Sequence, residues 1–294
     1  VFWQGLQANL KVIVNMDKPL RILMIVHTHW KRELGLARIP LELAEEFSKL
    51  GHIVEKFSCE DAFPHPQSRF EELTCNFQAR TEEFVRQNAH RFDVIDAFAS
   101  DLPFSKQRLG FRGLLVARSG GLRPLYEEAD RIYRLRYEEA KKIYRLGEHP
   151  WSIKALFRKL LTYFFYRRWH RYFTPSLRES DLIIVYNQDE LNYVNNVMGM
   201  GSKCIVLPLG LSDRRKEAFI QAIRPVAERP KNKEVVFIGC WSARKGSGDW
   251  PEIIKRVKDR IPQVRFKFLG TGYKEKEVLR DLRLPGGEGI KIIP

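Results

Sequence analysis

The stretch EVVFIGCWSARKG, at residues 234–246, contains the pattern that decides the fold. Its apolar run is typical of a buried strand and breaks at Gly239, and the basic pair Arg244 and Lys245 follows at once. Open α/β sheets bind ligands beyond the carboxyl ends of their strands, where fixed positive charge beside a helix start suits a diphosphate. A second run, VRFKFLGTGY at 264–273, repeats the pattern of strand and glycine. We therefore predict parallel βα units with an anion site at their carboxyl edge.

Six short runs upstream of this stretch predict the strands of another α/β domain, and the first of them is continuously apolar, which is typical of strands buried on both faces. They lie at residues 20–26, 53–58, 92–98, 113–119, 181–187 and 204–210. Between the first two, we expect a loop at 27–38 and a helix at 39–52 with a glycine stop at Gly51. The succession predicts a doubly wound parallel sheet.

The length and composition allow two domains. With 294 residues, of which 44% are hydrophobic, the chain can bury two moderate cores. Because MDKPLRILMIV resembles the start of a cytosolic α/β protein, Met16 is the expected initiator, the alternative being an ordinary extension before it. The expected parts are an N-terminal extension at 1–19, a first α/β domain at 20–208, a linker at 209–232 and the first part of a second α/β domain at 233–294.

The cysteines and the apolar runs indicate the compartment. The four cysteines show no CxxC spacing, which favours a reducing compartment and argues against a zinc site. No apolar run approaches the roughly 20 residues that a membrane span requires. Residues 1–15 also lack the charged and apolar segments of a signal peptide. We expect a cytoplasmic protein, with peripheral attachment to the inner membrane surface left open.

These segments together resemble the family 4 glycosyltransferases, which have two Rossmann-like domains in the arrangement called GT-B. The likeness runs from about residue 20 to the end of the chain. It rests on the order and spacing of GLAR, LAEEFSKLGHIVEKFS, FDVIDAF, VARSGGLRPLYEEA, SDLIIVYNQDE, VLPLGLSD, VVFIGCWSARKG and VRFKFLGTG. A generic dinucleotide-binding protein would place GxGxxG directly after its first strand, and no such motif follows Val26. The resemblance implies a retaining, metal-independent enzyme without cofactor, which moves a sugar from a nucleotide-sugar donor to a polysaccharide, lipid-linked or other glycan acceptor.

The resemblance also implies that cations and glycine loops bind the donor diphosphate. Lys245 matches the lysine of the family's KG motif, and Gly246 after it permits close backbone approach. The family usually has an arginine directly after the strand-ending glycine, where this chain has Cys240, so Arg244 is the candidate for the second charge. The alternative is that the basic pair is a solvated helix start. The other loop glycines that are candidates for donor or acceptor contacts are Gly239, Gly270 and Gly272.

Further candidates follow the first strand of the first domain. Gly35 matches a glycine of the family's first-strand loop, which lies against the donor phosphate and the acceptor; the alternative is a simple turn glycine. Arg38 shares that turn and is a candidate contact for an anionic acceptor. The HTH spacing of His27 and His29 suggests a metal pair, but histidines at strand ends are more often polar loop contacts. We therefore predict no metal site.

The loop VARSGGLRPLY departs from the family at Gly120, where many relatives have a histidine close to the sugar and the acceptor. Arg118, Ser119 and the backbone of the glycine pair can still offer a charge, a hydroxyl and N–H donors. Asp96 and Asp101, at the end of the preceding strand, are candidate carboxylates for orienting the acceptor. Loop capping is the alternative for both.

The catalytic residues are unknown from this sequence. The family's members resemble one another most in a Glu-x7-Glu element, whose place would be about two strands beyond Pro294. On that interpretation the polypeptide is a fragment without the carboxylates that hold the donor sugar, and it is inactive by itself.

The net charge of +15 is concentrated in residues 131–171, where lysine and arginine far outnumber glutamate. Within that region Trp151–Phe173 places aromatic and aliphatic residues on one helical face and cations elsewhere. A basic amphipathic helix of this kind is typical of an element attracted to an anionic membrane surface. The alternative is that the same face packs in the protein core.

Two other classes of function stay open. A nucleic-acid-binding protein would explain the basic composition, but no recognised binding module is present, so nucleic acid is not an expected partner. A sugar-nucleotide epimerase or a phosphorylase with the same two-domain architecture is the nearer alternative.

Overall fold

The computed structural model describes residues 18–64, 77–122, 124–126, 128, 131–132, 171–225, 227–228, 233–242, 245–283 and 287–294. The chain divides into two compact units. The first comprises Val1–Leu122 and Trp151–Ser212, and the second comprises Arg123–Pro150 and Asp213–Pro294. Three features expected from the sequence lie outside the described residues, namely the extension up to residue 15, Arg244 and most of the basic helix at 151–173.

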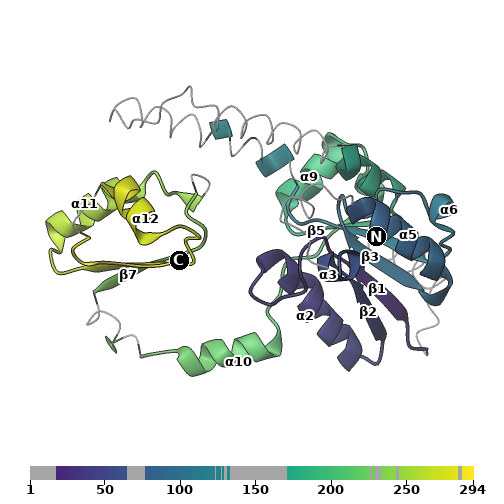
Figure 1. Ribbon diagram of the computed structural model, residues 1–294, viewed down its shortest axis with the longest axis horizontal. Helices are drawn as coiled ribbons and strands as arrows, with labels where there is room; N and C mark the ends of the chain where they lie inside the picture. Colours follow the sequence, from purple (N-terminus) through teal and green to yellow (C-terminus); the bar gives the residue numbers. More distant parts are fainter. Residues whose placement is uncertain are drawn as a thin grey trace. The chain divides into compact units, whose positions relative to one another are not determined.

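A six-stranded parallel sheet forms the centre of the first unit (Figure 1). Its strands are β1 (Arg21–Ile25), β2 (Ile53–Phe57), β3 (Val94–Phe98), β4 (Leu114–Arg118), β5 (Leu182–Val185) and β6 (Cys204–Val206). They follow the order β2-β1-β3-β4-β5-β6, which confirms the predicted doubly wound parallel sheet. Because the chain adds β2 on one side of β1 and β3 on the other, a topological switch point lies between β1 and β3. Ile25 lies opposite both Phe57 and Ala97, so these three strands end at one edge.

Helices connect the strands of the first unit. They include α2 (Gly35–Lys49), α3 (Cys59–Ala62), α5 (Phe77–Asn88), α6 (Lys106–Leu109) and α9 (Gln188–Asn196), with 3-10 turns η1 (Ala89–Arg91) and η2 (Gly201–Lys203). Val85 of α5 and Leu109 of α6 share a core cluster with Leu23 of β1. Met24 points to the opposite face and is also buried, so both faces of β1 are covered. In the described part of the chain, no helix of either unit is long and apolar enough to span a membrane.

Helix α2 begins earlier than the sequence predicted. It starts at Gly35 rather than at residue 39, so the loop after β1 ends at Leu34. A proline sterically disfavours the helical conformation at the residue before it. A pair such as Ile39 and Pro40 is therefore typical of a helix boundary. In the structure Pro40 lies inside the helix and is buried beside Leu41. The predicted start was therefore wrong because packing of this face outweighs the local preference.

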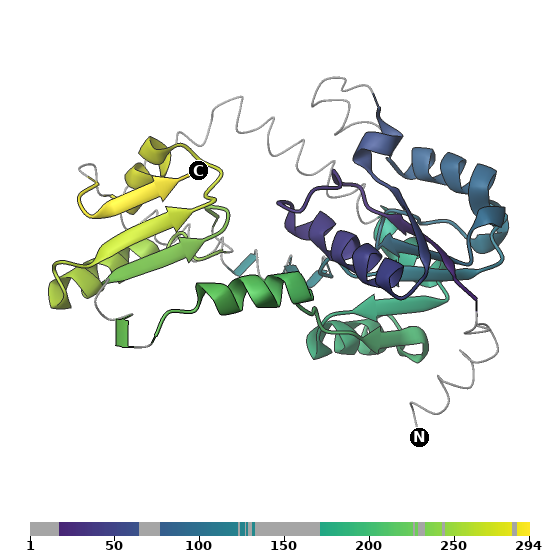
Figure 2. The same cartoon turned by 90° about the horizontal axis from the view of Figure 1, so that it is seen from below.

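The second unit contains a three-stranded parallel sheet in the order β7-β8-β9 (Figure 2). Its elements are α10 (Asp213–Ala222), β7 (Glu234–Ile238), α11 (Trp250–Arg260), β8 (Arg265–Leu269), α12 (Glu275–Leu282) and β9 (Ile290–Ile293). The core is aromatic, with Trp241, Phe266 and Phe268 all buried. Helix α10 occupies part of the segment predicted as a linker and has no buried residue.

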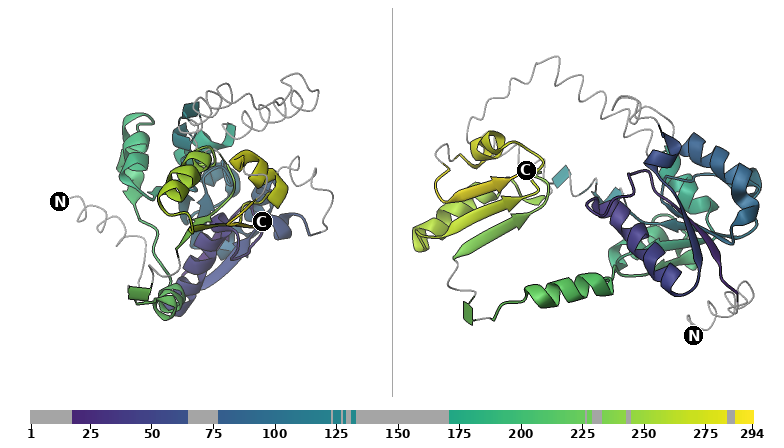
Figure 3. Two further views of the ribbon diagram at one scale, coloured as in Figure 1. Left: turned by 90° about the vertical axis from the view of Figure 1, so that its left-hand side faces the viewer. Right: turned by 60° about the horizontal axis from the view of Figure 1, so that its bottom comes forward.

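One face of the three-stranded sheet has exposed apolar side chains beside charged ones, among them the Lys267–Glu234 ion pair. Helices α11 and α12 lie together on the other side of the strands, which run side by side in Figure 3. Val236, Ile238 and Ile293 are 44%, 77% and 43% exposed, whereas Phe237 and Ile292 beside them are buried. Because side chains alternate along a strand, the exposed residues lie on the face opposite these two helices.

Candidate functional site

The carboxyl ends of β1 and β3 bring His27 and Asp101 together at the switch point. The Asp101 carboxylate accepts the His27 backbone N–H through Oδ2 at 3.0 Å, and its Oδ1 lies 2.8 Å from the ring Nδ1 of His27. The Asp101 side chain is 1% exposed, whereas the His27 side chain is 30% exposed. A buried carboxylate that orients a partly exposed imidazole is the arrangement of a general base. We call this pair the His27–Asp101 dyad.

The Asp101 carboxylate changes the proton affinity of His27. Burial alone lowers the pKa of His27, but the charge and the hydrogen bond of Asp101 more than offset burial, and the pKa ends above its ordinary value. The ring also lies edge-on to Phe77 of α5, with 6.5 Å between the ring centroids. An imidazolium formed by proton transfer would therefore have its counter-ion already in place, which favours proton abstraction.

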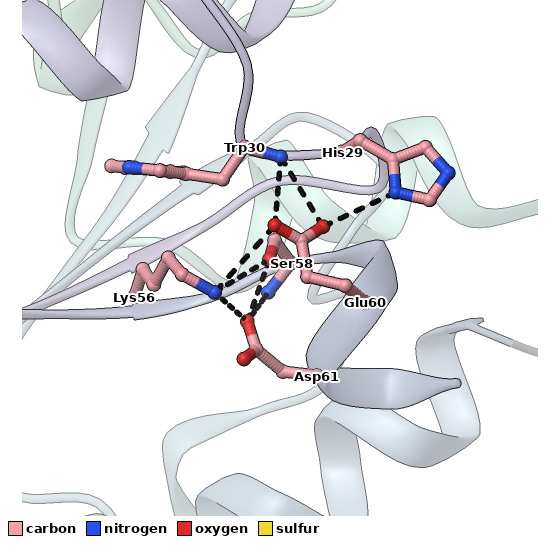
Figure 4. Close-up of polar contacts among 6 residues, drawn as sticks. All are labelled: His29, Trp30, Lys56, Ser58, Glu60 and Asp61. Carbon is pink, nitrogen blue, oxygen red and sulfur yellow. Dashed lines mark hydrogen bonds and ion pairs between the residues drawn. The ribbon is translucent and has the colours of Figure 1, made fainter. Parts of the chain in front are cut away.

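The loop between β1 and α2 is anchored at a second point, the Glu60 carboxylate of α3 (Figure 4). Its two oxygens accept the Trp30 backbone N–H at 3.0 and 3.2 Å, and Oε2 lies 3.5 Å from Nδ1 of His29. Lys56 lies 3.7 Å from Glu60 and donates to Asp61 at 2.6 Å. Burial alone raises the pKa of Glu60, but backbone hydrogen bonds and Lys56 bring it below its ordinary value. The loop that contains His27 is thus held by groups from β2, α3 and the end of β3.

The two histidines after β1 contact different carboxylates. His27 lies against Asp101 and His29 lies against Glu60, so they do not form the metal pair that the HTH spacing suggests. Within the ranges that the structure describes, no three histidine, cysteine or acidic side chains are grouped so that they could hold a metal ion.

Arg118 and Asp96 form a buried ion pair between β4 and β3. Arg118 Nη2 lies 2.5 Å from Asp96 Oδ2, and Arg118 Nε donates to Oδ1 at 3.0 Å. The side chains are 4% and 8% exposed. Burial alone lowers the pKa of Arg118, but Asp96 raises it above its ordinary value. The proposed roles of the two residues as donor or acceptor contacts stay predictions, and the structure adds that each charge already has a partner.

Hydrogen bonds of Ser119 hold the loop that follows β4. The Ser119 backbone N–H donates to the Ile184 carbonyl at 2.8 Å, and its Oγ accepts the Gly121 N–H at 2.9 Å. A Cβ added at Gly120 would lie 2.9 Å from Cδ1 of Leu36 on α2. The space beside Gly120 is therefore partly filled by Leu36, which fits the absence of a side chain at this position.

Gly35 and Arg38 both belong to the start of α2. Gly35 is the first residue of the helix, and a Cβ there would meet nothing within 4 Å. No side chain caps this helix end and its first turn has no acidic residue. The Arg38 side chain turns back along the loop, where its Nε donates to the Arg32 carbonyl at 2.7 Å. The contact of Arg38 with an anionic acceptor stays a prediction.

The carboxyl edge of the second unit is made of glycine turns. The Gly239 N–H donates to the Leu269 carbonyl at 2.9 Å, so the loops after β7 and β8 lie side by side. The φ angles of Gly239, Gly270 and Gly272 are 137°, 66° and 70°, in the region that favours glycine. Trp241 fixes the first loop, because its indole N–H donates to Asp281 of α12 at 3.1 Å.

Lys245 lies in the turn that precedes α11. Its backbone N–H donates to the Ser242 carbonyl at 2.9 Å, and Gly246 after it has a φ of 79°. The Lys245 side chain is exposed, while Ser247 is buried beneath the turn. An exposed ammonium group beside glycine turns is suited to an anionic ligand such as a diphosphate.

Sequence reasoning missed two features of the first unit. It treated His27 only as a loop contact, and it gave no role to Ser100, which adopts a φ of 89° next to Asp101. The position of His27 directly after the first strand was a signal that could have been followed. Ser100 gave no signal, because a left-handed conformation is expected from glycine and not from serine.

No protein-family model and no curated protein matches this chain. Its structure is similar to sucrose-phosphate synthase from Thermosynechococcus elongatus, with 13% identity, a TM-score of 0.54, and coverage of 93% of this chain and 70% of that one. MnaA of S. aureus, solved with UDP, has 11% identity, a TM-score of 0.51, and coverage of 93% and 68%. A Listeria monocytogenes protein described as a UDP-N-acetylglucosamine 2-epimerase has 11% identity, a TM-score of 0.50, and coverage of 94% and 69%. The chain therefore has the Rossmann-like α/β fold of the GT-B proteins.

Proposed function

We propose that this protein is a glycosyltransferase that moves a sugar from a nucleotide-sugar donor to a hydroxyl group of a glycan or lipid-linked acceptor. The observation on which the proposal rests is the His27–Asp101 dyad at the switch point of the six-stranded sheet. Open parallel sheets bind their ligands at that point. The exposed Lys245 in the second unit and the fold shared with sucrose-phosphate synthase support the donor assignment.

The dyad would act on the acceptor. With Nδ1 of His27 committed to Asp101, Nε2 would take the proton of the acceptor hydroxyl as its oxygen attacks the anomeric carbon of the donor sugar. The bond from that carbon to the diphosphate oxygen breaks, and the nucleoside diphosphate leaves. Asp101 would hold the ring tautomer and stabilise the imidazolium, and a positioned base of this kind contributes about 10²- to 10⁴-fold in rate.

Lys245 would act on the donor. The departing diphosphate gains negative charge, which a positioned cation stabilises without a metal ion. Arg244 is proposed as a second cation, and Gly239, Gly246, Gly270 and Gly272 would let the backbone approach the phosphates closely. The proposal therefore needs no cofactor besides the nucleotide sugar.

The stereochemical outcome separates two versions of the proposal. The first version is retention, which the resemblance to family 4 implies and which does not need His27 as a base. The dyad supports the second version, because a base that deprotonates the attacking hydroxyl serves a single displacement, which inverts the anomeric centre. The anomeric proton coupling of the product, measured by NMR, distinguishes the two.

A nucleotide-sugar epimerase is the second candidate function. It is favoured by the fold shared with the Listeria protein described as a UDP-N-acetylglucosamine 2-epimerase. An epimerase would convert UDP-N-acetylglucosamine without any acceptor, whereas a transferase would leave its sugar configuration unchanged. Incubation with this nucleotide sugar alone, followed by NMR, separates the two functions.

Attachment to an anionic membrane through Trp151–Phe173 remains part of the proposal for a lipid-linked acceptor. The net positive charge of the chain supports it. Flotation with vesicles of phosphatidylcholine alone and with added phosphatidylglycerol tests it directly. Equal binding to both vesicles would remove the electrostatic argument.

The transfer reaction is tested by comparing two histidines of the same loop. In the full-length protein, with UDP-glucose, UDP-N-acetylglucosamine and ADP-glucose as donors, His27→Gln should lower the transfer rate about 10²- to 10⁴-fold. His29→Gln is the matched control and should retain most of the rate. Equal, measurable rates for His27→Gln and the unmodified full-length protein would reject the dyad as the base.

A further inference from the structure

The Glu190 carboxylate joins two loops at the carboxyl edge of the six-stranded sheet. Its Oε2 accepts the N–H of Tyr186, directly after β5, at 2.9 Å, and its Oε1 accepts the N–H of Leu122, in the loop after β4, at 3.3 Å. Glu190 is 5% exposed, and no cation pairs with its side chain in the described part of the chain. A buried carboxylate is unfavourable unless it is compensated, and here backbone N–H groups of two loops compensate it.

Capping of helix α9 explains one of these contacts but not the other. Glu190 lies in the first turn of α9, and the cap itself is Asn187, whose side chain accepts the Glu190 N–H at 2.9 Å. A glutamate in this turn commonly reaches back to N–H groups at the helix start, as Glu190 does at Tyr186. Leu122 lies 68 positions earlier in the chain. Its contact with Glu190 therefore serves the loop after β4 rather than the helix.

This contact completes the hydrogen bonding of the loop after β4. The N–H groups of Ser119 and Gly121 are bonded to other groups of the first unit, and the N–H of Leu122 is bonded to Glu190. Gly120 is exposed, and its N–H makes no hydrogen bond within the described residues. Among the N–H groups from residue 119 to residue 122, all of which the structure describes, the one at Gly120 remains to bind a ligand.

Gly120 lies at the same edge as the His27–Asp101 dyad. A Cβ built on Gly120 would be 2.9 Å from Cδ1 of Leu36, at the start of α2, and 3.3 Å from Cδ1 of Phe98, at the end of β3. The Asp101 N–H donates to the Phe98 carbonyl at 2.9 Å, and His27 belongs to the loop that leads to α2. In the proposed reaction the acceptor oxygen attacks the anomeric carbon beside His27, so the donor sugar has to lie at this edge.

We propose that Glu190 is a positioning residue, which holds the loop after β4 at Leu122 so that the Gly120 N–H donates to a hydroxyl oxygen of the donor sugar. The contact with the sugar rests on the proposed function, whereas the hold on the loop follows from the contacts of the carboxylate. A neutral hydrogen bond of this kind changes an affinity about two- to tenfold.

The hold on the loop is tested by hydrogen exchange of the backbone amides, followed by NMR on the whole chain. Glu190→Gln keeps the shape and one acceptor oxygen, but its amide nitrogen cannot accept a hydrogen bond. The longer bond, to Leu122, should therefore be lost, and exchange at Leu122 should become about ten- to a hundredfold faster.

Asp189→Asn is the matched control for this measurement. It removes an exposed carboxylate from the same first turn of α9 and should leave exchange at Leu122 unchanged. Exchange of the N–H at position 190, which is bonded to the Asn187 cap, should stay the same in both variants. That result would show that the helix is intact and that the effect is confined to the loop.

The contact with the sugar is tested by calorimetric titration of the full-length protein with the three nucleotide sugars named above, and with UDP and ADP as references without a sugar. Glu190→Gln should raise the dissociation constant of the nucleotide sugar about two- to tenfold and leave that of the nucleotide unchanged. In the unmodified protein, the Gly120 amide proton signal should move downfield when the nucleotide sugar is added, but not when the nucleotide is added. A merely structural role for Glu190 would produce neither difference.

Three results would overturn the proposal. Unchanged exchange at Leu122 in Glu190→Gln would show that the carboxylate does not hold the loop. Faster exchange with unchanged affinity for the nucleotide sugar would show that the loop does not contact the sugar, and equal weakening of the nucleotide would assign the contact to the diphosphate. Failure of the proposed function looks different, because the unmodified protein then transfers no sugar although exchange at Leu122 still responds to Glu190→Gln.

Discussion

The carboxyl edge of the six-stranded sheet is built from paired charges, whereas the carboxyl edge of the three-stranded sheet is built from glycine turns. At the first edge, His27 and Arg118 each contact a buried aspartate. At the second edge, the backbone bends at glycines and Lys245 remains exposed. Proton transfer needs groups held in one geometry, while binding of a diphosphate needs backbone that can approach it closely and a mobile cation. The contrast is the one expected if the first edge acts on an acceptor and the second binds a donor.

The largest effect on stability is expected at the first edge, from Arg118→Met. It leaves the Asp96 carboxylate buried without its cation, which costs about 3–5 kcal/mol of the free energy of unfolding. Urea unfolding followed by circular dichroism measures the loss. The double variant Arg118→Met with Asp96→Leu is the control and should recover most of it. A loss below about 1 kcal/mol for the single variant would mean that the pair is more hydrated than its burial indicates.

The next effect is expected at the second edge, from Lys245→Ala. Charge-assisted contacts are worth about 1.5–3 kcal/mol, so the dissociation constants of UDP and ADP should rise about tenfold to a hundredfold. Calorimetric titration measures both. Lys255→Ala, an exposed lysine on α11, is the matched control and should leave binding unchanged. Equal affinities for Lys245→Ala and the unmodified chain would remove Lys245 from the donor site.

Substitution of one glycine from each edge should give smaller changes in the free energy of unfolding, and these changes should differ between the two edges. Gly246→Ala should lower the free energy of unfolding by about 1 kcal/mol, because alanine is strained at a φ of 79° although its Cβ would make only an ordinary contact, 3.5 Å from Asp249 Oδ2. Gly35→Ala, at the first position of α2, should change it by no more than about 0.5 kcal/mol. Thermal unfolding monitored by tryptophan fluorescence compares the two. Equal changes would contradict the view that position 246 requires the conformational freedom of glycine and position 35 does not.

The smallest effect is a pH dependence specific to the first edge. The pKa of His27 is raised in the folded protein, so the stabilisation from the dyad is complete below the unfolded pKa of histidine, about 6.5, and is lost as the pH rises through the folded pKa. The unfolding midpoint should therefore fall as the pH rises above about 6.5. Asp101→Asn should flatten this slope. The lowered pKa of Glu60 acts in the opposite direction and only at acid pH, so it does not mask the effect.

The strands were predictable because each is a short apolar run followed by polar or glycine residues. All the predicted strands are present. Those buried on both faces, such as β1, leave a continuous apolar pattern in the sequence. The start of α2 was not predictable in the same way, because Pro40 disfavours a helix locally and is accommodated only by packing.

The sequence singled out some residues that lie at the first edge, but it did not predict their pairings or the part played by His27. Asp96, Asp101 and Arg118 were all candidates, yet the contact of Asp101 with His27 joins residues that are 74 positions apart. No local pattern predicts such a contact, because it depends on β1 and β3 being neighbours. The left-handed turn at Ser100 is equally hidden, since the residue type predicts a different backbone conformation.

The sequence by itself determined the parallel α/β architecture, the glycine turns of the second unit and the position of Lys245 among them. These follow from patterns within a few residues, where hydrophobic burial and backbone freedom act locally. Only the tertiary structure decided that Arg118 is neutralised by Asp96, that Leu36 partly fills the space beside Gly120, and that Asp101 orients His27. Those outcomes depend on strand order and side-chain packing, because electrostatic and steric contacts act between neighbours in space.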